Sequence, residues 1–279
     1  MPELPEVEVT RRRLERAWTG QRLVGLELRD PRLAADAGQT LDEWCALLVG
    51  ETLQPPQRRA KHLIVPTTGG HAMLIHLRMT GKMIDLDAQA EYGTHVRLVF
   101  ALGNGARWAF QDTRRFGRFQ VVAEEALAAH HELRRLGPDA LLQPSDAARL
   151  AEICARTSRS IKALLMDQQA IGGIGNICAT EILFRAGVAP ARPADSLARE
   201  EIERLAAEIV PHLEWAIEKL TERRKLLYVN EPGATHPFPV YGRGGEPCPD
   251  CGALILRTVI TGRSTFHCPV CQPDGNGPA

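Results

Sequence analysis

The chain has 279 residues, of which 44% are apolar, enough for two modest globular domains with cores of their own. Its 34 basic and 34 acidic side chains cancel, so binding to a polyanion would require the positive charge to be gathered on one face. No apolar run approaches the roughly 20 residues of a membrane span, and the acidic N-terminus is unlike a signal peptide. Seven cysteines, an odd number, argue against a secreted disulfide scaffold, so we expect a cytoplasmic protein.

The first part of the chain is predicted to be one helix followed by an antiparallel β-sandwich or barrel. Residues 4–18 have a helical pattern, because Pro5 suits the first turn and Glu6 the positive end of the helix dipole. Short strand-like segments then alternate with turns such as Gly103-Asn104-Gly105. The predicted strands are residues 23–28, 63–65, 73–77, 82–87, 96–102, 108–110 and 119–122.

From about residue 124 the pattern becomes helical. Helices are predicted at 146–156, 160–166, 177–186 and 196–224, and Pro211 should kink or split the last one. The predicted fold is therefore α+β with two domains. The predicted divisions are 1–124 (β-sandwich with flanking helices), 125–229 (helical), 230–239 (loop), 240–273 (metal-bearing hairpin) and 274–279 (disordered tail).

Two cysteine pairs near the C-terminus predict a metal site. Cys248-Pro249-Asp250-Cys251 is followed, after 16 residues, by Cys268-Pro269-Val270-Cys271. Four thiolates at this spacing bind one Zn²⁺ tetrahedrally, and no further ligand nearby suggests an open catalytic position, so the zinc should be structural. The alternatives are two chance pairs or a redox dithiol. The remaining cysteines are expected to be ordinary buried residues.

Arg263 lies between the two cysteine pairs, in a Gly-Arg-Ser turn between two expected strands. A guanidinium at the tip of a metal-pinned hairpin is suited to binding phosphate. From the local sequence alone, a solvated turn charge is also open.

The N-terminus is a second candidate centre. Pro2 is small enough that Met1 should be removed, which leaves a secondary amine of lower pKa than lysine. Such an amine is a credible Schiff-base nucleophile, and Glu3 beside it could transfer protons. The alternative is that this segment simply leads into the first helix.

Several motifs, taken together and in order, resemble the formamidopyrimidine-DNA glycosylase family. The resemblance extends from residue 2 to about residue 271 and ends with the cysteine pairs. The motifs are Met1-Pro2-Glu3-Leu4-Pro5-Glu6-Val7-Glu8, Arg11-Arg12, Arg58-Arg59-Ala60-Lys61, His76-Leu77-Arg78-Met79-Thr80-Gly81, Asp112-Thr113-Arg114-Arg115-Phe116-Gly117, Ile161-Lys162, Leu165-Met166-Asp167, Gly173-Ile174-Gly175-Asn176-Ile177 and Val240-Tyr241-Gly242-Arg243.

This resemblance implies a bifunctional glycosylase and AP lyase with a β-sandwich, a helix–two-turn–helix domain and a zinc ribbon. It implies that Pro2 attacks C1′ of the damaged nucleotide, expels the base and forms an imine, after which both flanking phosphates are eliminated. Glu3 would act as acid/base and Glu6 would orient the centre. Lys61 would act at the phosphate beside the lesion.

The resemblance also implies how damaged double-stranded DNA is bound. Met79, Arg114 and Phe116 would fill the gap left by an everted nucleotide, with Arg114 facing the orphaned base. The remaining predicted DNA contacts are His76, Lys162, Asn176 and Arg263. The expected cationic face consists of Lys61, Arg114, Lys162, Asn176 and Arg263. We expect a monomer with no membrane partner.

The sequence departs from the family pattern in the loop at 230–239, where three prolines in ten residues replace the usual glycine-rich form. This leaves the choice of oxidised base open. Thr113 stands where relatives often have proline, and Cys178 where they often have tyrosine. Besides a glycosylase for 8-oxoguanine and formamidopyrimidines, two alternatives remain: an endonuclease VIII-like enzyme for oxidised pyrimidines, and a damaged-DNA binder without catalysis.

Overall fold

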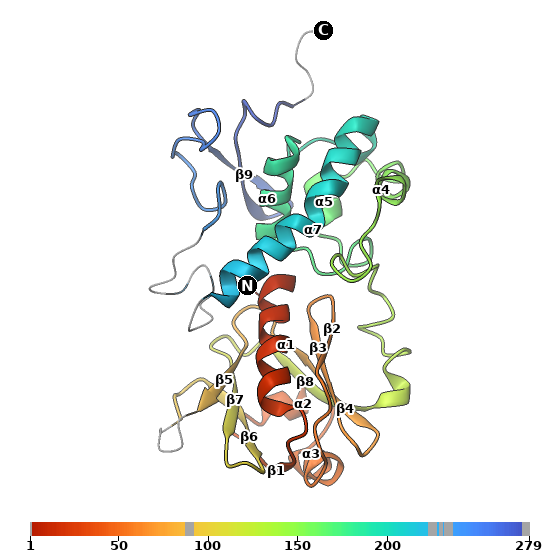
Figure 1. The fold of residues 1–279 in the computed structure, drawn as a ribbon, viewed down its shortest axis with the longest axis vertical. Helices are drawn as coiled ribbons and strands as arrows, with labels where there is room; N and C mark the ends of the chain where they lie inside the picture. Colours follow the sequence, from red (N-terminus) through yellow and green to blue (C-terminus); the bar gives the residue numbers. More distant parts are fainter. Residues whose placement is uncertain (1, 87–91, 223–227, 229–230, 232–236, 275–279) are drawn as a thin grey trace. The chain divides into compact units, whose positions relative to one another are not determined.

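The computed structural model describes residues 2–86, 92–222, 228, 231 and 237–274. The chain forms two compact units, drawn in Figure 1, and each is described by itself. The N-terminal unit comprises Met1–Pro2 and Glu6–Arg134, and the C-terminal unit comprises Glu3–Pro5 and Arg135–Ala279. The predicted finer divisions of the C-terminal part stay predictions.

The N-terminal unit contains two four-stranded antiparallel sheets. One has the order β1-β6-β7-β5 and the other β2-β3-β4-β8. The first consists of β1 (Leu23–Leu28), β6 (Val96–Leu102), β7 (Arg107–Gln111) and β5 (Lys82–Leu86); the second of β2 (Gln57–Arg59), β3 (His62–Pro66), β4 (His71–His76) and β8 (Arg118–Ala123). The helices are α1 (Leu4–Trp18), α2 (Arg32–Ala35), α3 (Leu41–Leu48) and the 3-10 turn η1 (Glu124–Ala126).

One apolar core joins the two sheets and helices α1, α2 and α3. The rings of Phe100 in one sheet and Phe119 in the other lie 5.8 Å apart. Trp18 of α1 packs on Phe100 and Trp44 of α3 on Phe119, with ring centroids 5.0 and 4.6 Å apart. Because both sheets bury their inner faces against one another, the predicted β-sandwich is confirmed.

Three turns leave the same end of the sheet β2-β3-β4-β8. The register places Arg59, His62, His76 and Arg118 in one row across its four strands. Residues 60–61 connect β2 to β3, residues 77–81 lead from β4 to β5, and residues 112–117 lead from β7 to β8. The topology therefore collects three segments that are far apart in the sequence.

The C-terminal unit is helical and ends in a two-stranded hairpin. Its long helix α7 packs against α6, whose side chains are almost all buried. The elements are α4 (Ala147–Cys154), α5 (Ile161–Leu165), α6 (Asn176–Ala186), η2 (Ala194–Ser196), α7 (Arg199–Thr221), β9 (Leu256–Ile260) and β10 (Arg263–His267).

The predicted helices and strands are present, with ends that shift by three residues at most. The short elements β2, α2 and α3 were not predicted. Pro211 does not split α7, which is continuous. Proline has no backbone N–H, so the carbonyl of Ala207 has no hydrogen-bond donor within the helix at this point. Pro211 and Ala207 are both exposed, and water can donate to this carbonyl instead.

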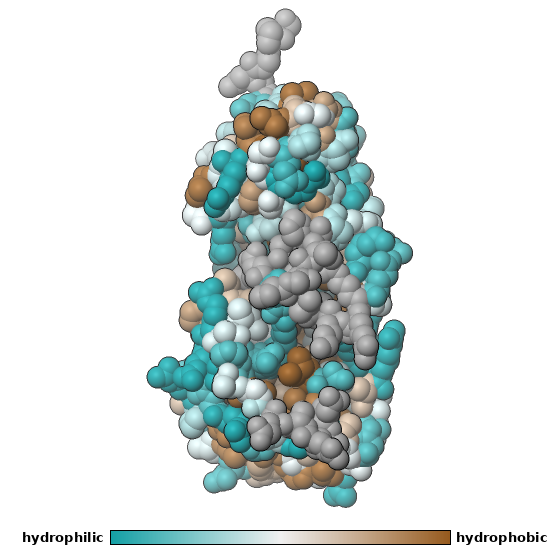
Figure 2. All heavy atoms as spheres, turned by 90° about the vertical axis from the view of Figure 1, so that its left-hand side faces the viewer, coloured by the Kyte–Doolittle hydropathy of each residue, from teal (hydrophilic) through white to brown (hydrophobic). Residues whose placement is uncertain are grey.

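Some large apolar side chains are exposed in the described part of the chain, for example Val24, Phe116 and Val259. In the described part of the chain, no helix is long and apolar enough to cross a membrane. The face in Figure 2 shows small hydrophobic patches separated by hydrophilic residues. Most of the predicted loop at 230–239 and nearly all of the predicted tail lie outside the described residues.

Candidate functional site

Lys61 lies in the two-residue turn between β2 and β3, beside Ala60, whose φ is +52°. Arg58 stabilises this turn, because its Nη1 donates a hydrogen bond to the Ala60 carbonyl at 3.0 Å. The Arg58 side chain is fully buried and pairs with Glu8 of α1 at 3.0 Å. Burial would raise the pKa of Glu8, but hydrogen bonds from arginines lower it, so the buried pair is ionised and the turn is fixed.

His76 ends β4, and burial lowers its pKa to about 2, so the ring is neutral at physiological pH. Its Nδ1 accepts the backbone N–H of Arg78 at 3.0 Å. A neutral imidazole that accepts at Nδ1 carries its proton on Nε2. His76 is therefore a neutral hydrogen-bond donor at Nε2.

Asp112 joins the turn that carries Met79 to the turn that carries Arg114. Its carboxylate is buried, accepts the Thr80 hydroxyl, and accepts the backbone N–H of Gly117 at 2.7 Å. The backbone N–H of Arg114 lies 3.1 Å from the Thr80 hydroxyl and 3.2 Å from Asp112. One carboxylate thus fixes the two turns relative to each other.

Arg114 and Phe116 protrude from their turn. Phe116 is 51% exposed, which is unusual for so large an apolar side chain, and the Arg114 guanidinium lies 4.8 Å from the centre of its ring. Gly117 is required beneath them, because a Cβ there would lie 2.4 Å from the ring of Phe110. An arginine and an aromatic ring presented together can hydrogen-bond and stack against bases.

Glu3 is held in the C-terminal unit at the N-terminus of α6. Its two carboxylate oxygens accept the backbone N–H groups of Ile177 at 2.8 Å and Cys178 at 3.0 Å. Glu3 is buried, and so is Pro2, to which it is covalently joined. A carboxylate at a helix N-terminus is stabilised by the free N–H groups and the helix dipole. The acid predicted to act beside Pro2 therefore has a fixed position.

The glycines before α6 are required by this arrangement. A Cβ at Gly175 would lie 2.2 Å from the Glu3 carboxyl carbon, and one at Gly173, whose φ is +109°, 2.4 Å from Leu4. Glycines before a helix N-terminus often let the backbone approach a bound phosphate. In the structure, the anion at this helix end is the Glu3 carboxylate.

Lys162 and Asn176 both bind the hairpin beside Arg263. The Lys162 Nζ donates to the Thr265 hydroxyl at 2.7 Å and lies 3.4 Å from the Ser264 carbonyl, which also accepts from Asn176 Nδ2 at 3.1 Å. Lys162 is buried, and burial lowers its pKa to about 8. Arg263 itself is exposed. The structure therefore connects three of the predicted DNA contacts, but only Arg263 of the three is exposed.

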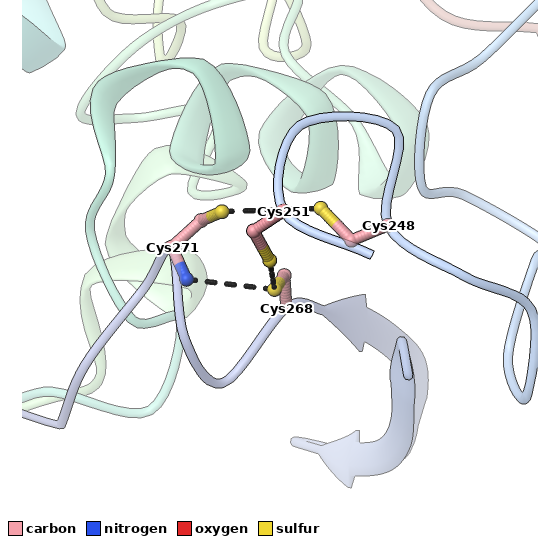
Figure 3. A group of neighbouring side chains, drawn as sticks. All are labelled: Cys248, Cys251, Cys268 and Cys271. Atoms are coloured by element: carbon pink, nitrogen blue, oxygen red, sulfur yellow. Dashed lines mark hydrogen bonds between the residues drawn. The ribbon is translucent and has the colours of Figure 1, made fainter. Parts of the chain in front are cut away.

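The four predicted zinc ligands converge, as Figure 3 shows. The sulfur atoms of Cys248, Cys251, Cys268 and Cys271 all lie within 4.8 Å of one another. Sγ of Cys248 lies 3.8 Å from that of Cys271, and Sγ of Cys251 lies 3.4 Å from that of Cys268. Zn–S bonds of about 2.3 Å place the sulfurs of a tetrahedron about 3.8 Å apart, so the residues fit one structural zinc ion.

Two residues with positioning roles were not singled out from the sequence. Asp112 is part of the motif Asp112-Thr113-Arg114-Arg115-Phe116-Gly117, and an aspartate two residues before an exposed turn residue is a signal for side-chain-to-backbone bonding. Ser264, whose carbonyl receives Lys162 and Asn176, gave no sequence signal because the interaction uses its backbone.

Comparison with known families covers most of the chain. Residues 1–119 match the formamidopyrimidine-DNA glycosylase N-terminal domain, residues 136–225 the formamidopyrimidine-DNA glycosylase H2TH domain, and residues 245–273 a zinc finger found in FPG and IleRS. The chain is 39% identical over 275 residues to the formamidopyrimidine-DNA glycosylase of Geobacillus kaustophilus and 40% identical over 277 residues to that of Desulfitobacterium hafniense. Each alignment covers 98% of this chain and 100% of the relative.

The chain belongs to the formamidopyrimidine-DNA glycosylase family. Solved structures agree with this membership: Lactococcus lactis Fpg bound to DNA with an abasic site is 29% identical and superposes with a TM-score of 0.87, over 98% of this chain and 100% of that one. The same protein bound to Fapy-dG DNA is 30% identical, with a TM-score of 0.86, over 97% and 100% of the two chains. Its complex with DNA that contains an oxidised pyrimidine is 29% identical, with a TM-score of 0.85, over 98% and 100%. This chain is thus a DNA glycosylase of base-excision repair with the AP lyase activity characteristic of the family.

Proposed function

We propose that this glycosylase removes oxidised purines, with 8-oxoguanine and formamidopyrimidines as leading substrates, through a Schiff base on Pro2. The full-length family match is the observation that carries this proposal. The names of the relatives and the Fapy-dG complex favour purine lesions over the endonuclease VIII-like alternative. A binder without catalysis is disfavoured because every predicted catalytic position is filled.

In the proposed reaction, the Pro2 nitrogen bonds to C1′, the glycosidic bond breaks, and the base leaves with a proton. Opening of the sugar turns the C1′–N bond into an iminium, which acidifies C2′ and allows elimination of the 3′ and then the 5′ phosphate. Glu3, the residue next to Pro2 in the sequence, accepts and returns the protons. Two backbone N–H donors hold its carboxylate in place. Lys61 stabilises the phosphate next to the lesion.

For DNA binding, we propose that Met79, Arg114 and Phe116 enter the gap left by the everted nucleotide. The geometry supports this proposal. The two turns that carry these side chains leave one end of a rigid sheet, and the Asp112 carboxylate binds both turns. Arg263 binds the DNA backbone. Lys162 and Asn176 hold the hairpin that carries Arg263. His76 donates from Nε2 to phosphate.

Borohydride trapping on DNA with an abasic site tests the Schiff base. The wild-type chain should become covalently attached to DNA, and Pro2→Gly should trap at least about tenfold less at an unchanged melting temperature. Glu3→Gln should also trap poorly. Full trapping by either variant would contradict the assignment.

The matched control is the same protein with Met1 retained, verified by mass spectrometry. It differs by the one added residue, Met1, and its Pro2 nitrogen is an amide that cannot form an imine. Trapping by this form as efficient as that of the processed protein would contradict Pro2 as the nucleophile.

Lesion choice is tested by excision from a panel of duplexes that carry 8-oxoguanine, a formamidopyrimidine or thymine glycol. We expect the two purine lesions to be removed faster. Dominant removal of thymine glycol would instead support the endonuclease VIII-like alternative. The Lactococcus lactis complex with an oxidised pyrimidine makes this arm of the panel necessary.

We further propose that the enzyme works as a monomer in the cytoplasm, on chromosomal DNA. Its cysteines support a reducing compartment, since no disulfide forms among the described residues. Fractionation with the nucleoid at low salt, and release at high salt, would support this location.

A further inference from the structure

One row of the sheet β2-β3-β4-β8 carries four basic side chains next to one another. The register pairs Arg59 with His62, His62 with His76, and His76 with Arg118. Directly opposed residues on antiparallel strands point to the same face, and the rings of His62 and His76 indeed lie 4.5 Å apart. His76 is neutral, and the guanidiniums of Arg59 and Arg118 at the two ends of the row favour an acid beside it.

Glu132, in the segment that follows β8, is that acid. Its Oε2 lies 3.3 Å from Nε2 of His62, and its Oε1 accepts from Arg78 at 2.9 Å and from Arg118 at 3.4 Å. Its side chain is only 14% exposed. The hydrogen bond with His62 is the main cause that lowers the pKa of Glu132 to about 2, so the carboxylate is ionised at every physiological pH.

Arg78, which Glu132 binds, has an uncommon backbone conformation directly before Met79. Its φ is +51°, in the left-handed region that residues other than glycine, asparagine and aspartate seldom adopt. Two contacts hold it there: its backbone N–H donates to His76 at 3.0 Å, and its guanidinium donates to Glu132. Backbone strain of this kind persists where surrounding contacts enforce it, and it is common at functional turns.

We propose that Glu132 is a positioning residue for DNA insertion: it holds Arg78 in the left-handed turn and thereby aims Met79 at the gap left by the everted nucleotide. Glu132 acts through Arg78 and does not touch the DNA. The inference rests on the proposed function, because insertion of Met79 is part of that function. It assigns a role to a residue that belongs to none of the motifs that carry the family resemblance.

The experiment compares wild type, Glu132→Gln, Arg78→Gln and the double variant in the full-length protein. Insertion is read from the fluorescence of 2-aminopurine placed beside an abasic-site analogue, and chemistry from single-turnover excision of 8-oxoguanine and from trapping at a preformed abasic site. We expect Glu132→Gln to lower both the fluorescence change and the excision rate about tenfold. Trapping at the abasic site, which needs no base removal, should stay within about twofold.

A double-mutant cycle separates positioning from a general loss of stability. Adding Glu132→Gln to Arg78→Gln should cost less than about twofold further, whereas adding it to Arg118→Gln should keep its full effect. The matched control is Glu125→Gln, which removes the same charge from an exposed position in the same segment and should change nothing. Should Glu132→Gln prove unstable, Arg78→Gln removes the same contact while Glu132 keeps its bonds to His62 and Arg118, and it should show the same defect.

Three results would overturn the proposal: unchanged fluorescence and excision in Glu132→Gln, equal losses of excision and abasic-site trapping, or an undiminished effect of Glu132→Gln in the Arg78→Gln background. Failure of wild type to trap at all would instead contradict the proposed function. The fluorescence measurement needs no chemistry, so it still decides the role of Glu132 in that case.

Discussion

The two units each present an arginine on a turn, but they stabilise that turn in different ways. Arg114 follows Asp112, whose buried carboxylate binds the turn backbone of a unit in which two sheets and three helices share one core. Arg263 follows the turn residues Thr261 and Gly262, whose φ values are +47° and +72°, at the end of a hairpin. The buried cluster around this hairpin is small, and two of its members, Cys248 and Cys268, are zinc ligands.

This difference shows that the size of the core determines which interactions hold a DNA-binding residue in place. A sandwich buries enough apolar surface to keep its turns rigid with hydrogen bonds alone. A hairpin of about thirty residues does not, so it needs a metal ion and anchors from neighbouring helices. Lys162 and Asn176 provide those anchors at Ser264.

Loss of zinc should produce the largest effect and should be confined to one unit. A strong chelator, or Cys268→Ser, is expected to weaken duplex binding more than about 100-fold, because zinc binding contributes about 10 kcal/mol to the folding of small zinc domains. The near-UV circular dichroism of Trp18, Trp44 and Trp108 in the sandwich should stay nearly unchanged. Metal analysis should give about one zinc per chain before treatment. A parallel loss of the tryptophan signal would show that the ribbon stabilises both units.

Asp112→Ala should have the next largest effect, now in the sandwich. It leaves the buried N–H of Gly117 and its neighbours without an acceptor, which costs about 3 kcal/mol of unfolding free energy. Excision should fall at least about tenfold while zinc content stays normal. Asp85→Ala, at an exposed position of β5, is the matched control and should be neutral. Thermal melts and single-turnover excision measure the two effects, and a neutral Asp112→Ala would show that the turns are held elsewhere.

The C-terminal unit contains a buried acid, Glu181, whose ionisation should lower the stability of the fold as the pH rises. Burial raises the pKa of Glu181 on α6 from 4.5 to about 7, against the lowering effect of the N–H groups of Tyr241 and Val240. An acid whose pKa is higher in the folded state stabilises the fold below about pH 4.5, and this contribution is lost as the pH rises through about 7. The loss should approach about 3 kcal/mol.

Melting curves of wild type and Glu181→Gln from pH 4.5 to 8 measure this contribution. Glutamine keeps an oxygen acceptor for both N–H groups but does not ionise in this range. The variant should therefore lose less stability than wild type as the pH rises. Parallel curves would mean that Glu181 ionises normally in the folded protein.

The smallest expected effects compare the two arginines directly. Arg263→Gln should reduce the slope of log binding constant against log salt by about one, because we propose that Arg263 contacts phosphate. Arg114→Gln should keep the slope and lose discrimination between partner bases, because we propose that Arg114 faces the orphaned base. Arg199→Gln, which removes an exposed charge on α7, should leave the slope unchanged. An equal loss of slope in Arg114→Gln would contradict the insertion of Arg114 and would remove this contrast between the two turns.

Local patterns were sufficient for most elements and for the metal site. Hydrophobic periodicity and turn residues predicted residues 4–18 as a helix and all the longer strands, because these signals act within a few residues. The spacing of the cysteine pairs predicted four converging thiolates for the same reason. The short strand β2 was missed, since three polar residues carry no period and are held only by pairing with β3.

The amino-acid sequence by itself therefore determined the fold class, the zinc ligands and the list of chemically capable residues. Only the tertiary structure decided which of them are exposed and what holds them. In the structure, Lys162 is buried against the hairpin, and the Glu3 carboxylate binds the N-terminus of α6. Glu132 binds Arg78, which lies 54 positions away in the sequence. Such contacts join residues far apart in the chain, and their free energy depends on burial and geometry that no local pattern encodes.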